Sequence, residues 1–103
     1  MKRQIMPVAI FRVKDKSMKP SINDGDYVIA SRVSYIFAKP KAGDIVVLRH
    51  PSGRFFIVKR IARITGKGYF VVGDNKPVSE DSRKFGAVGR DSIVGKVFMV
   101  IRE

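Results

Sequence analysis

Apolar and β-branched residues occur along the chain in short runs, and each run ends in residues that are typical of turns. No segment carries apolar residues at helical spacing over about ten residues or more. The pattern therefore predicts a mainly β protein built from short antiparallel strands, with little helix. The runs predict strands over residues 5–13, 27–33, 44–49, 55–64, 69–72 and 93–101.

The segments between the predicted strands carry their own turn chemistry. Asn23-Asp-Gly-Asp26 predicts a tight turn, and Pro51-Ser-Gly53 and Thr65-Gly-Lys-Gly68 predict hairpins. Residues 34–43 are expected to form a connector and residues 73–89 a long polar loop. Turns at this spacing are typical of a small, closed or half-closed β architecture.

Composition narrows the classes of site that the chain can build. Its 103 residues suit a single domain over residues 1–103, and its 45% hydrophobic content excludes general disorder. It contains no cysteine and one histidine, His50, which precedes a turn and is interpreted as a surface residue. These counts exclude disulfides, thiolate zinc sites, a cysteine nucleophile and a site with several histidine ligands. We therefore expect no metal and no other cofactor.

The chain is strongly basic, with 21 lysine and arginine residues against 9 aspartate and glutamate residues and a net charge of +12 at pH 7. This charge suits contact with nucleic acid or an anionic membrane surface, but the basic residues are scattered and equally suit a solvated surface. No apolar run approaches the roughly 20 residues that cross a bilayer. We expect no transmembrane segment and a location in the cytoplasm or peripherally on a membrane.

Three segments carry more polar specificity than turns require. Ser17 follows the first predicted strand, Lys59 lies within the most apolar strand, and the loop 73–86 is dense in hydrogen-bonding groups. Taken alone, each has an ordinary structural explanation: a turn serine, an edge-strand lysine and a loop that satisfies its own polar groups. The loop contributes Asp74, Asn75, Ser79, Asp81, Ser82 and Arg83.

Taken together, the three segments indicate a serine nucleophile. Strand alternation places Lys59 on the face of Ile57 and Ile61, and apolar surroundings lower the pKa of a lysine amine. The neutral amine could then take the proton of the Ser17 hydroxyl, as in serine–lysine variants of the catalytic triad. A loop serine such as Ser79 could orient that amine without recharging it.

The order of these segments resembles the type I signal peptidase family. The similarity covers about residues 12–98, and the loop 73–83 is its most specific part. Within the family, the chain is similar to the short, anchorless nickel superoxide dismutase maturation proteases, which carry a stretch like Leu48-Arg-His-Pro51. The resemblance implies the small β-barrel-type fold of signal peptidases and SOS-repressor peptidases. The matching stretches are Ser17-Met-Lys-Pro20, Gly25-Asp26, Gly43-Asp-Ile-Val-Val47, Val58-Lys-Arg-Ile61, Gly73-Asp-Asn75, Ser79-Glu-Asp-Ser-Arg83 and Phe85-Gly86.

The resemblance also implies a role for each site residue. Ser17 would be the nucleophile, with its own backbone N–H donating to the oxyanion, Lys59 the general base, and Ser79 the residue that orients the lysine amine. A protein or peptide substrate would bind as an extended strand, with small residues before the cut. Loop support falls to Asp74, Asn75, Asp81, Ser82 and Arg83, and the substrate pocket to Met18 and Pro20.

One position departs from the family pattern. Two residues before the nucleophile, where members usually carry glycine or serine, this chain has Asp15. A carboxylate there would repel a developing oxyanion and favour the charged form of a nearby lysine. Asp15 therefore either points away from the site, lowers the activity or serves a different substrate.

We therefore expect a serine endopeptidase that uses a Ser17–Lys59 dyad to remove an N-terminal leader or signal peptide. Self-cleaving SOS repressors share the serine-methionine and lysine pattern, but they lack a loop like 73–83 and carry a separate DNA-binding domain. The alternative from another class is a basic β-barrel module that binds nucleic acid and has an inactive dyad. It would need aromatic and basic residues interleaved on one exposed face, whereas Phe55 and Phe56 alternate between faces, so no nucleic acid is expected as a partner.

Overall fold

Strands dominate the computed structural model, which describes residues 6–103. Each predicted strand overlaps an observed one, and the prediction of a mainly β fold is confirmed. The predicted start of the first strand at residue 5 lies outside the described residues. The strands are β1 (Val8–Arg12), β2 (Tyr27–Ser31), β3 (Ile45–Arg49), β4 (Phe56–Thr65), β5 (Gly68–Val72) and β6 (Ile93–Ile101).

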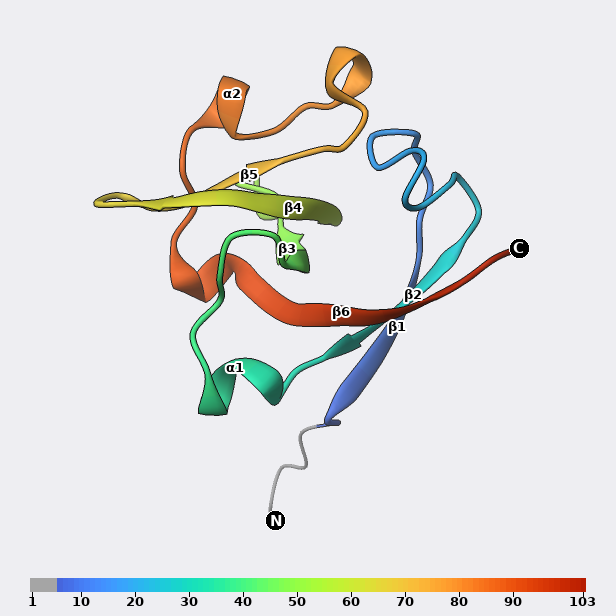
Figure 1. Ribbon diagram of the computed structural model, residues 1–103, viewed down its shortest axis with the longest axis horizontal. Coiled ribbons are helices and arrows are strands. Elements are labelled where there is room, and N and C mark those ends of the chain that lie inside the picture. The colour runs from blue at the N-terminus through green and yellow to red at the C-terminus, as the bar shows by residue number, and fades with distance from the viewer. Residues whose placement is uncertain (1–5) are drawn as a thin grey trace.

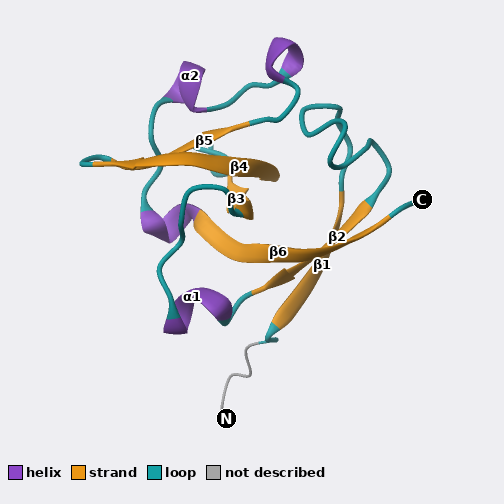
Figure 2. Ribbon diagram, in the orientation of Figure 1, coloured by secondary structure: helices purple, strands orange, loops and turns teal. Residues whose placement is uncertain are grey.

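The helices are single turns placed in the connections between strands (Figure 2). None is long enough to show helical periodicity, so the sequence pattern did not predict them. Within residues 6–103, no helix has the length and apolar character needed to cross a membrane. The helices are α1 (Ser34–Phe37), η1 (Lys76–Val78), α2 (Ser82–Phe85) and η2 (Arg90–Ser92).

All six strands join one antiparallel sheet in the order β1-β2-β6-β3-β4-β5 (Figure 1). The last strand, β6, lies between β2 and β3, so it joins the N-terminal strands to the β3–β4–β5 meander. The sheet curls enough to bring its first strand against its fifth in sheet order, since the ring of Phe11 on β1 lies 5.6 Å from that of Phe56 on β4. The curl agrees with the half-closed architecture that the turn spacing predicts.

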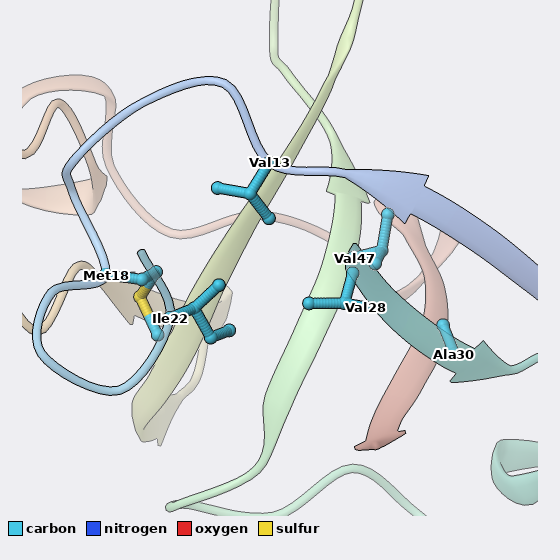
Figure 3. Close-up of a cluster of buried hydrophobic side chains, with 6 residues drawn as sticks. All are labelled: Val13, Met18, Ile22, Val28, Ala30 and Val47. Atoms are coloured by element: carbon cyan, nitrogen blue, oxygen red, sulfur yellow. The ribbon is translucent and has the colours of Figure 1, made fainter. Parts of the chain in front are cut away.

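Two groups of buried apolar side chains stabilise the sheet, and β3 contributes to both. Val47 faces one group, whereas Val46 and Leu48 face the other, because successive strand residues point to opposite faces. The first cluster, drawn in Figure 3, consists of Val13, Met18, Ile22, Val28, Ala30 and Val47. The second cluster consists of Val46, Leu48, Ile61, Val71, Val88 and Ile93.

Two loops meet at one end of the sheet. The loop between β1 and β2 carries Ser17, and the loop after β5 carries residues 73–86 (Figure 1). Met18 and Ile22 anchor the first loop in the first cluster, as Figure 3 shows. A backbone hydrogen bond of 2.8 Å from Asn75 N–H to the Ser17 carbonyl joins the two loops. The segments singled out in the sequence therefore lie together in the fold.

Candidate active site

Ser17 and Lys59 lie in direct contact although they are far apart in the sequence. Lys59 Nζ donates a hydrogen bond of 2.8 Å to Ser17 Oγ. Both residues are buried, with 4% of Ser17 and 2% of Lys59 exposed. Lys59 pairs with Val46 on β3, and β4 lies between β3 and β5, so Lys59 is not an edge-strand lysine. The structure thus brings together the serine and the lysine that the sequence singles out.

The protonation of Lys59 is set by opposing effects. Burial lowers the pKa of its ammonium below the ordinary value, because a charged amine is poorly solvated there. The carboxylates of Asp15, Asp81 and Glu80 act in the opposite direction, and the Arg83 guanidinium adds to the lowering. Burial outweighs the carboxylates, so the pKa of Lys59 is lowered, and its neutral amine forms at a lower pH than that of an exposed lysine.

A chain of hydrogen bonds fixes the lysine amine. Lys59 Nζ also donates to Ser79 Oγ at 3.2 Å, and Ser79 Oγ donates to Asp81 Oδ2 at 2.8 Å. Arg83 Nε donates to Asp81 Oδ1 at 2.9 Å. Because Ser79 gives its own proton to Asp81, its oxygen is left to accept from the amine.

Asp81 is the buried anchor of this chain, with 1% of the residue exposed. Burial by itself would raise the pKa of its carboxyl group, but hydrogen bonds from Arg83, Gly73 N–H and Ser79 outweigh burial and lower the pKa. Asp81 therefore remains a carboxylate that holds Ser79 and Arg83. The ion pair between Asp81 and Arg83 is partly buried, because the Asp81 side chain is buried and the Arg83 side chain is 42% exposed.

The other loop residues singled out in the sequence hold the loop against its neighbours. Both oxygens of Asp74 accept from Arg60, each at 2.9 Å. Asn75 Nδ2 donates to the Lys16 carbonyl at 2.9 Å, next to the nucleophile. Ser82 Oγ accepts from Val71 N–H at 2.9 Å and thereby ties the loop to β5. The polar side chains of the loop thus bind neighbouring segments, and the loop also carries Ser79, which contacts Lys59.

Gly73 is required where the loop passes the dyad. A Cβ atom at this position would lie 2.2 Å from Ser79 Oγ and 2.6 Å from the Ser17 carbonyl oxygen. Both distances are far shorter than a van der Waals contact. Any side chain at Gly73 would push Ser79 and the nucleophile apart.

Met18 and Pro20, which the resemblance assigns to the substrate pocket, occupy different environments. Met18 is fully buried in the first cluster, directly after the nucleophile. Pro20 is exposed two residues further on. Neither residue lines the two clefts beside the dyad, so their assignment to a substrate pocket stays a prediction.

Asp15 points toward Ser17. Its Oδ1 atom accepts hydrogen bonds from Ser17 N–H at 3.1 Å and from Ser17 Oγ at 2.9 Å. Of the alternatives that the sequence left open, a carboxylate turned away from the site is therefore wrong. The backbone N–H of Ser17, which is expected to donate to an oxyanion, therefore already donates to Asp15.

Two clefts border the dyad, and Asp15 lines both of them. The dyad cleft, of about 330 Å³, contains Ser17 and Lys59. The apolar cleft, of about 280 Å³, lies beside it between the end of β1 and residues 55–58. An extended segment could therefore pass the nucleophile while placing a side chain in the apolar cleft.

The sequence did not identify the residues that form the rim of the dyad cleft. His50 was interpreted as a surface residue, but its side chain is only 17% exposed and its Nε2 lies 3.0 Å from Glu80 Oε1. The His50 ring also stacks on Phe55, with 4.5 Å between ring centroids. The partners are up to 30 residues apart, and no sequence spacing signals such a pair.

Nowhere in residues 6–103 do three His, Asp or Glu side chains gather as a metal site.

Comparisons with known proteins show which family the sequence matches. The family model described as signal peptidase, peptidase S26, matches residues 4–68 and 62–102. The chain is 30% identical to mitochondrial ATP-independent inner membrane protease subunit 1a of Arabidopsis thaliana, over 89% of this chain and 69% of that protein. It is 27% identical to signal peptidase IB of Staphylococcus aureus (strain COL), over 87% of this chain and 75% of that protein. It is 28% identical to thylakoidal processing peptidase 1, chloroplastic, of Arabidopsis thaliana, over 82% of this chain, but it spans only 39% of that relative's length.

Proposed function

Because the chain belongs to the signal peptidase family, peptidase S26, whose members are serine-type peptidases, we propose that it removes an N-terminal leader or signal peptide with a Ser17–Lys59 dyad. The 2.8 Å hydrogen bond between Lys59 Nζ and Ser17 Oγ, made by a lysine that is 2% exposed, carries the proposal. A buried amine with a lowered pKa can act as a base at a pH at which an exposed lysine is charged.

In the acylation step, Ser17 Oγ attacks the carbonyl carbon of the scissile peptide bond, and the neutral Lys59 amine takes the hydroxyl proton. The Ser17 backbone N–H donates to the resulting oxyanion. As the tetrahedral intermediate collapses, the Lys59 ammonium gives its proton to the leaving amine, and the C-terminal product departs. An ester joins the leader to Ser17. In the second step Lys59 takes a proton from water, and the hydroxide attacks the ester carbon. The bond between that carbon and Ser17 Oγ then breaks, Ser17 regains its proton from Lys59, and the leader departs with a free carboxyl group.

Ser79 and Asp81 would position the amine during both steps. Ser79 Oγ accepts one N–H of Lys59, and the proton of Ser79 is committed to Asp81. This arrangement leaves the lone pair of the neutral amine free to face Ser17. A neutral serine next to the amine orients it without favouring its charged form, as a carboxylate would.

The substrate would bind as an extended strand along the apolar cleft. This cleft is lined mainly by apolar residues of two segments, including Phe11, Val13 and Phe56. An extended backbone can hydrogen-bond to a neighbouring chain while alternate side chains enter pockets. Its volume, about 280 Å³, is enough for at least one side chain of the substrate.

The protein would also contact an anionic membrane surface peripherally. Its net charge of +12 is one support. A second is the apolar end of the molecule where β1 begins and α1 lies, with Ile36 71% and Phe37 86% exposed (Figure 1). Co-sedimentation with anionic but not with zwitterionic vesicles, weakened by Phe37→Ser, is the expected result. Equal sedimentation of the variant would exclude this end of the molecule as the contact.

The proposed function is tested by mass spectrometry of leader peptides with small residues near the scissile bond, incubated from about pH 6 to 10. The wild type is compared with Ser17→Ala, Lys59→Ala and Lys67→Ala, the last being an exposed lysine in the β4–β5 turn. We expect cleavage by the wild type and by Lys67→Ala alone, rising with pH as Lys59 loses its proton. Cleavage that survives Ser17→Ala would refute the assignment of the nucleophile.

A further inference from the structure

The carboxylate of Asp15 occupies the position that an oxyanion would need. Its Oδ1 atom lies 3.1 Å from Ser17 N, the nitrogen whose N–H would donate to the intermediate. Donors of an oxyanion hole act at about 2.7–3.1 Å from a negatively charged oxygen, and Oδ1 is such an oxygen. A substrate carbonyl cannot accept from this N–H in the same way while Asp15 holds it.

Asp15 also competes for the proton of the nucleophile. Ser17 Oγ donates to Asp15 Oδ1 at 2.9 Å and accepts from Lys59 Nζ at 2.8 Å. Attack on a carbonyl requires the opposite arrangement, in which the Ser17 hydroxyl donates to a neutral Lys59 amine. With Asp15 in this position, the hydroxyl proton therefore points away from the base.

The contact is held weakly enough to be exchanged. Asp15 is exposed, and within residues 6–103 its carboxylate accepts hydrogen bonds from Ser17 alone. Asp81, by comparison, is buried and accepts from Ser79, Gly73 and Arg83. Because Asp15 lines both clefts, a substrate that fills them contacts this carboxylate.

We propose that Asp15 caps the nucleophile of the free enzyme and that the scissile carbonyl displaces its carboxylate before reaction. This inference rests on the proposed function of the Ser17–Lys59 dyad. Asp15 is a positioning residue that acts through Ser17, and the Asp15 cap holds both the oxyanion donor and the hydroxyl until a substrate exchanges for it.

Displacement of the cap also changes the charge around Lys59. The charged groups that act on Lys59 are Asp15, Asp81 and Glu80, which favour its ammonium form, and Arg83, which opposes it. His50 and Lys16 line the same cleft. Removal of the Asp15 charge leaves two of the three carboxylates, so the amine loses its proton at lower pH.

The kinetic test compares kcat and KM for one peptide substrate across pH in the wild type, Asp15→Gly and Asp15→Asn. We expect Asp15→Gly to raise kcat/KM roughly tenfold or more and to shift the rising limb of the pH profile to lower pH. Asp15→Asn should cause the same pH shift with a smaller gain, since an amide oxygen still accepts from the N–H group. Asp24→Asn, which neutralises an exposed carboxylate outside both clefts, is the matched control. Unchanged or lower kcat/KM in both Asp15 variants would overturn the proposal.

A second measurement keeps the Asp15 cap separate from the dyad function. The amide proton resonance of Ser17 in the free protein reports the hydrogen bond to the carboxylate. It should move upfield in Asp15→Gly but not in Asp24→Asn. An unmoved resonance would overturn the Asp15 cap even if the enzyme is active. If the wild type and the variants all fail to cleave any peptide, the proposed function fails, and the Ser17 resonance alone decides whether the cap exists.

Discussion

The two halves of the dyad are held in contrasting ways. Lys59 lies on an interior strand beside the second cluster, and its amine is tied to Ser79 and through it to Asp81. Ser17 lies in a loop that is anchored from beneath by Met18, and its hydroxyl faces the exposed side chain of Asp15. The Lys59 amine is therefore held by side-chain hydrogen bonds, whereas the loop of Ser17 is held by apolar packing and by hydrogen bonds from Asn75 to its backbone carbonyls.

Physical chemistry explains the contrast. A buried amine is costly unless its hydrogen-bonding groups have partners, so Lys59 needs the loop 73–86 around it. A serine hydroxyl is small and uncharged, and its position follows from the backbone that carries it. The Lys59 amine accordingly has a chain of side-chain partners, whereas the Ser17 hydroxyl contacts Asp15, the side chain that we propose a substrate displaces.

The two halves lie beside different clusters, and β3 contributes to both clusters. Val47 belongs to the cluster beneath the nucleophile, and Val46, which is paired with Lys59, belongs to the other. A change in one cluster should therefore disturb mainly one partner of the dyad.

The largest effect is expected from removal of either reacting group. Ser17→Ala and Lys59→Met should each lower kcat/KM by roughly a thousandfold or more, since neither variant has another nucleophile or base in place. Methionine retains an unbranched apolar side chain in the buried site. Urea unfolding should show that both variants remain folded. Activity of Lys59→Met close to wild type would exclude Lys59 as the base.

Loss of the orienting hydroxyl should have a smaller effect on the lysine side. Ser79→Ala removes one of the two acceptors of Lys59 Nζ and should lower kcat by roughly ten- to a hundredfold with little change in KM. Ser34→Ala, a change at a serine in α1 that lines neither cleft, is the matched control. A rise in KM at constant kcat would indicate that Ser79 binds substrate instead of orienting the amine.

Packing should be the sensitive property on the serine side. Met18→Ala leaves a cavity in the first cluster and should lower the free energy of unfolding by about 2–5 kcal/mol, measured by urea denaturation. Ile10→Ala, at a residue that is 64% exposed, should change stability by only about 0.5 kcal/mol. If the two variants were equally stable, Met18 would not anchor the loop of the nucleophile.

The smallest predicted effect concerns acid stability on the lysine side. Asp81 has a lowered pKa in the folded protein, so the stability it contributes is complete above the unfolded value of about 3.9 and is lost as pH falls below it. Asp81→Asn should be less stable at neutral pH and should lose less stability between about pH 5 and 2. An identical pH dependence in wild type and variant would contradict the proposed anchoring role of the carboxylate.

The sequence predicted the strands and the contact between Ser17 and Lys59. Strands repeat a pattern of alternating residues, and the polar residues around Lys59 are clustered in one loop. Alternation along β4 correctly placed Lys59 with Ile57 and Ile61, and the dense polar loop provided Ser79 and Asp81. Pairings between exposed side chains carry no such signal. The contact between His50 and Glu80 depends on where two turns meet in space.

The sequence also did not predict the direction of the Asp15 side chain. The sequence identified the residue as a departure from the family pattern and described what a carboxylate would do there. The direction of its side chain depends on the local turn that carries Ser17, because both hydrogen bonds reach only two residues along the chain. Composition and spacing do not specify the torsion angles that direct the Asp15 carboxylate toward Ser17.

The most direct test of the account is the titration of the Lys59 side chain by NMR, followed at its ε-carbon in protein with labelled lysine and assigned with Lys59→Met. We predict a midpoint below the value of about 10.4 for an unperturbed lysine, and a rise of kcat/KM with the same midpoint. A midpoint at or above that value would contradict the central claim that Lys59 serves as a neutral base for Ser17.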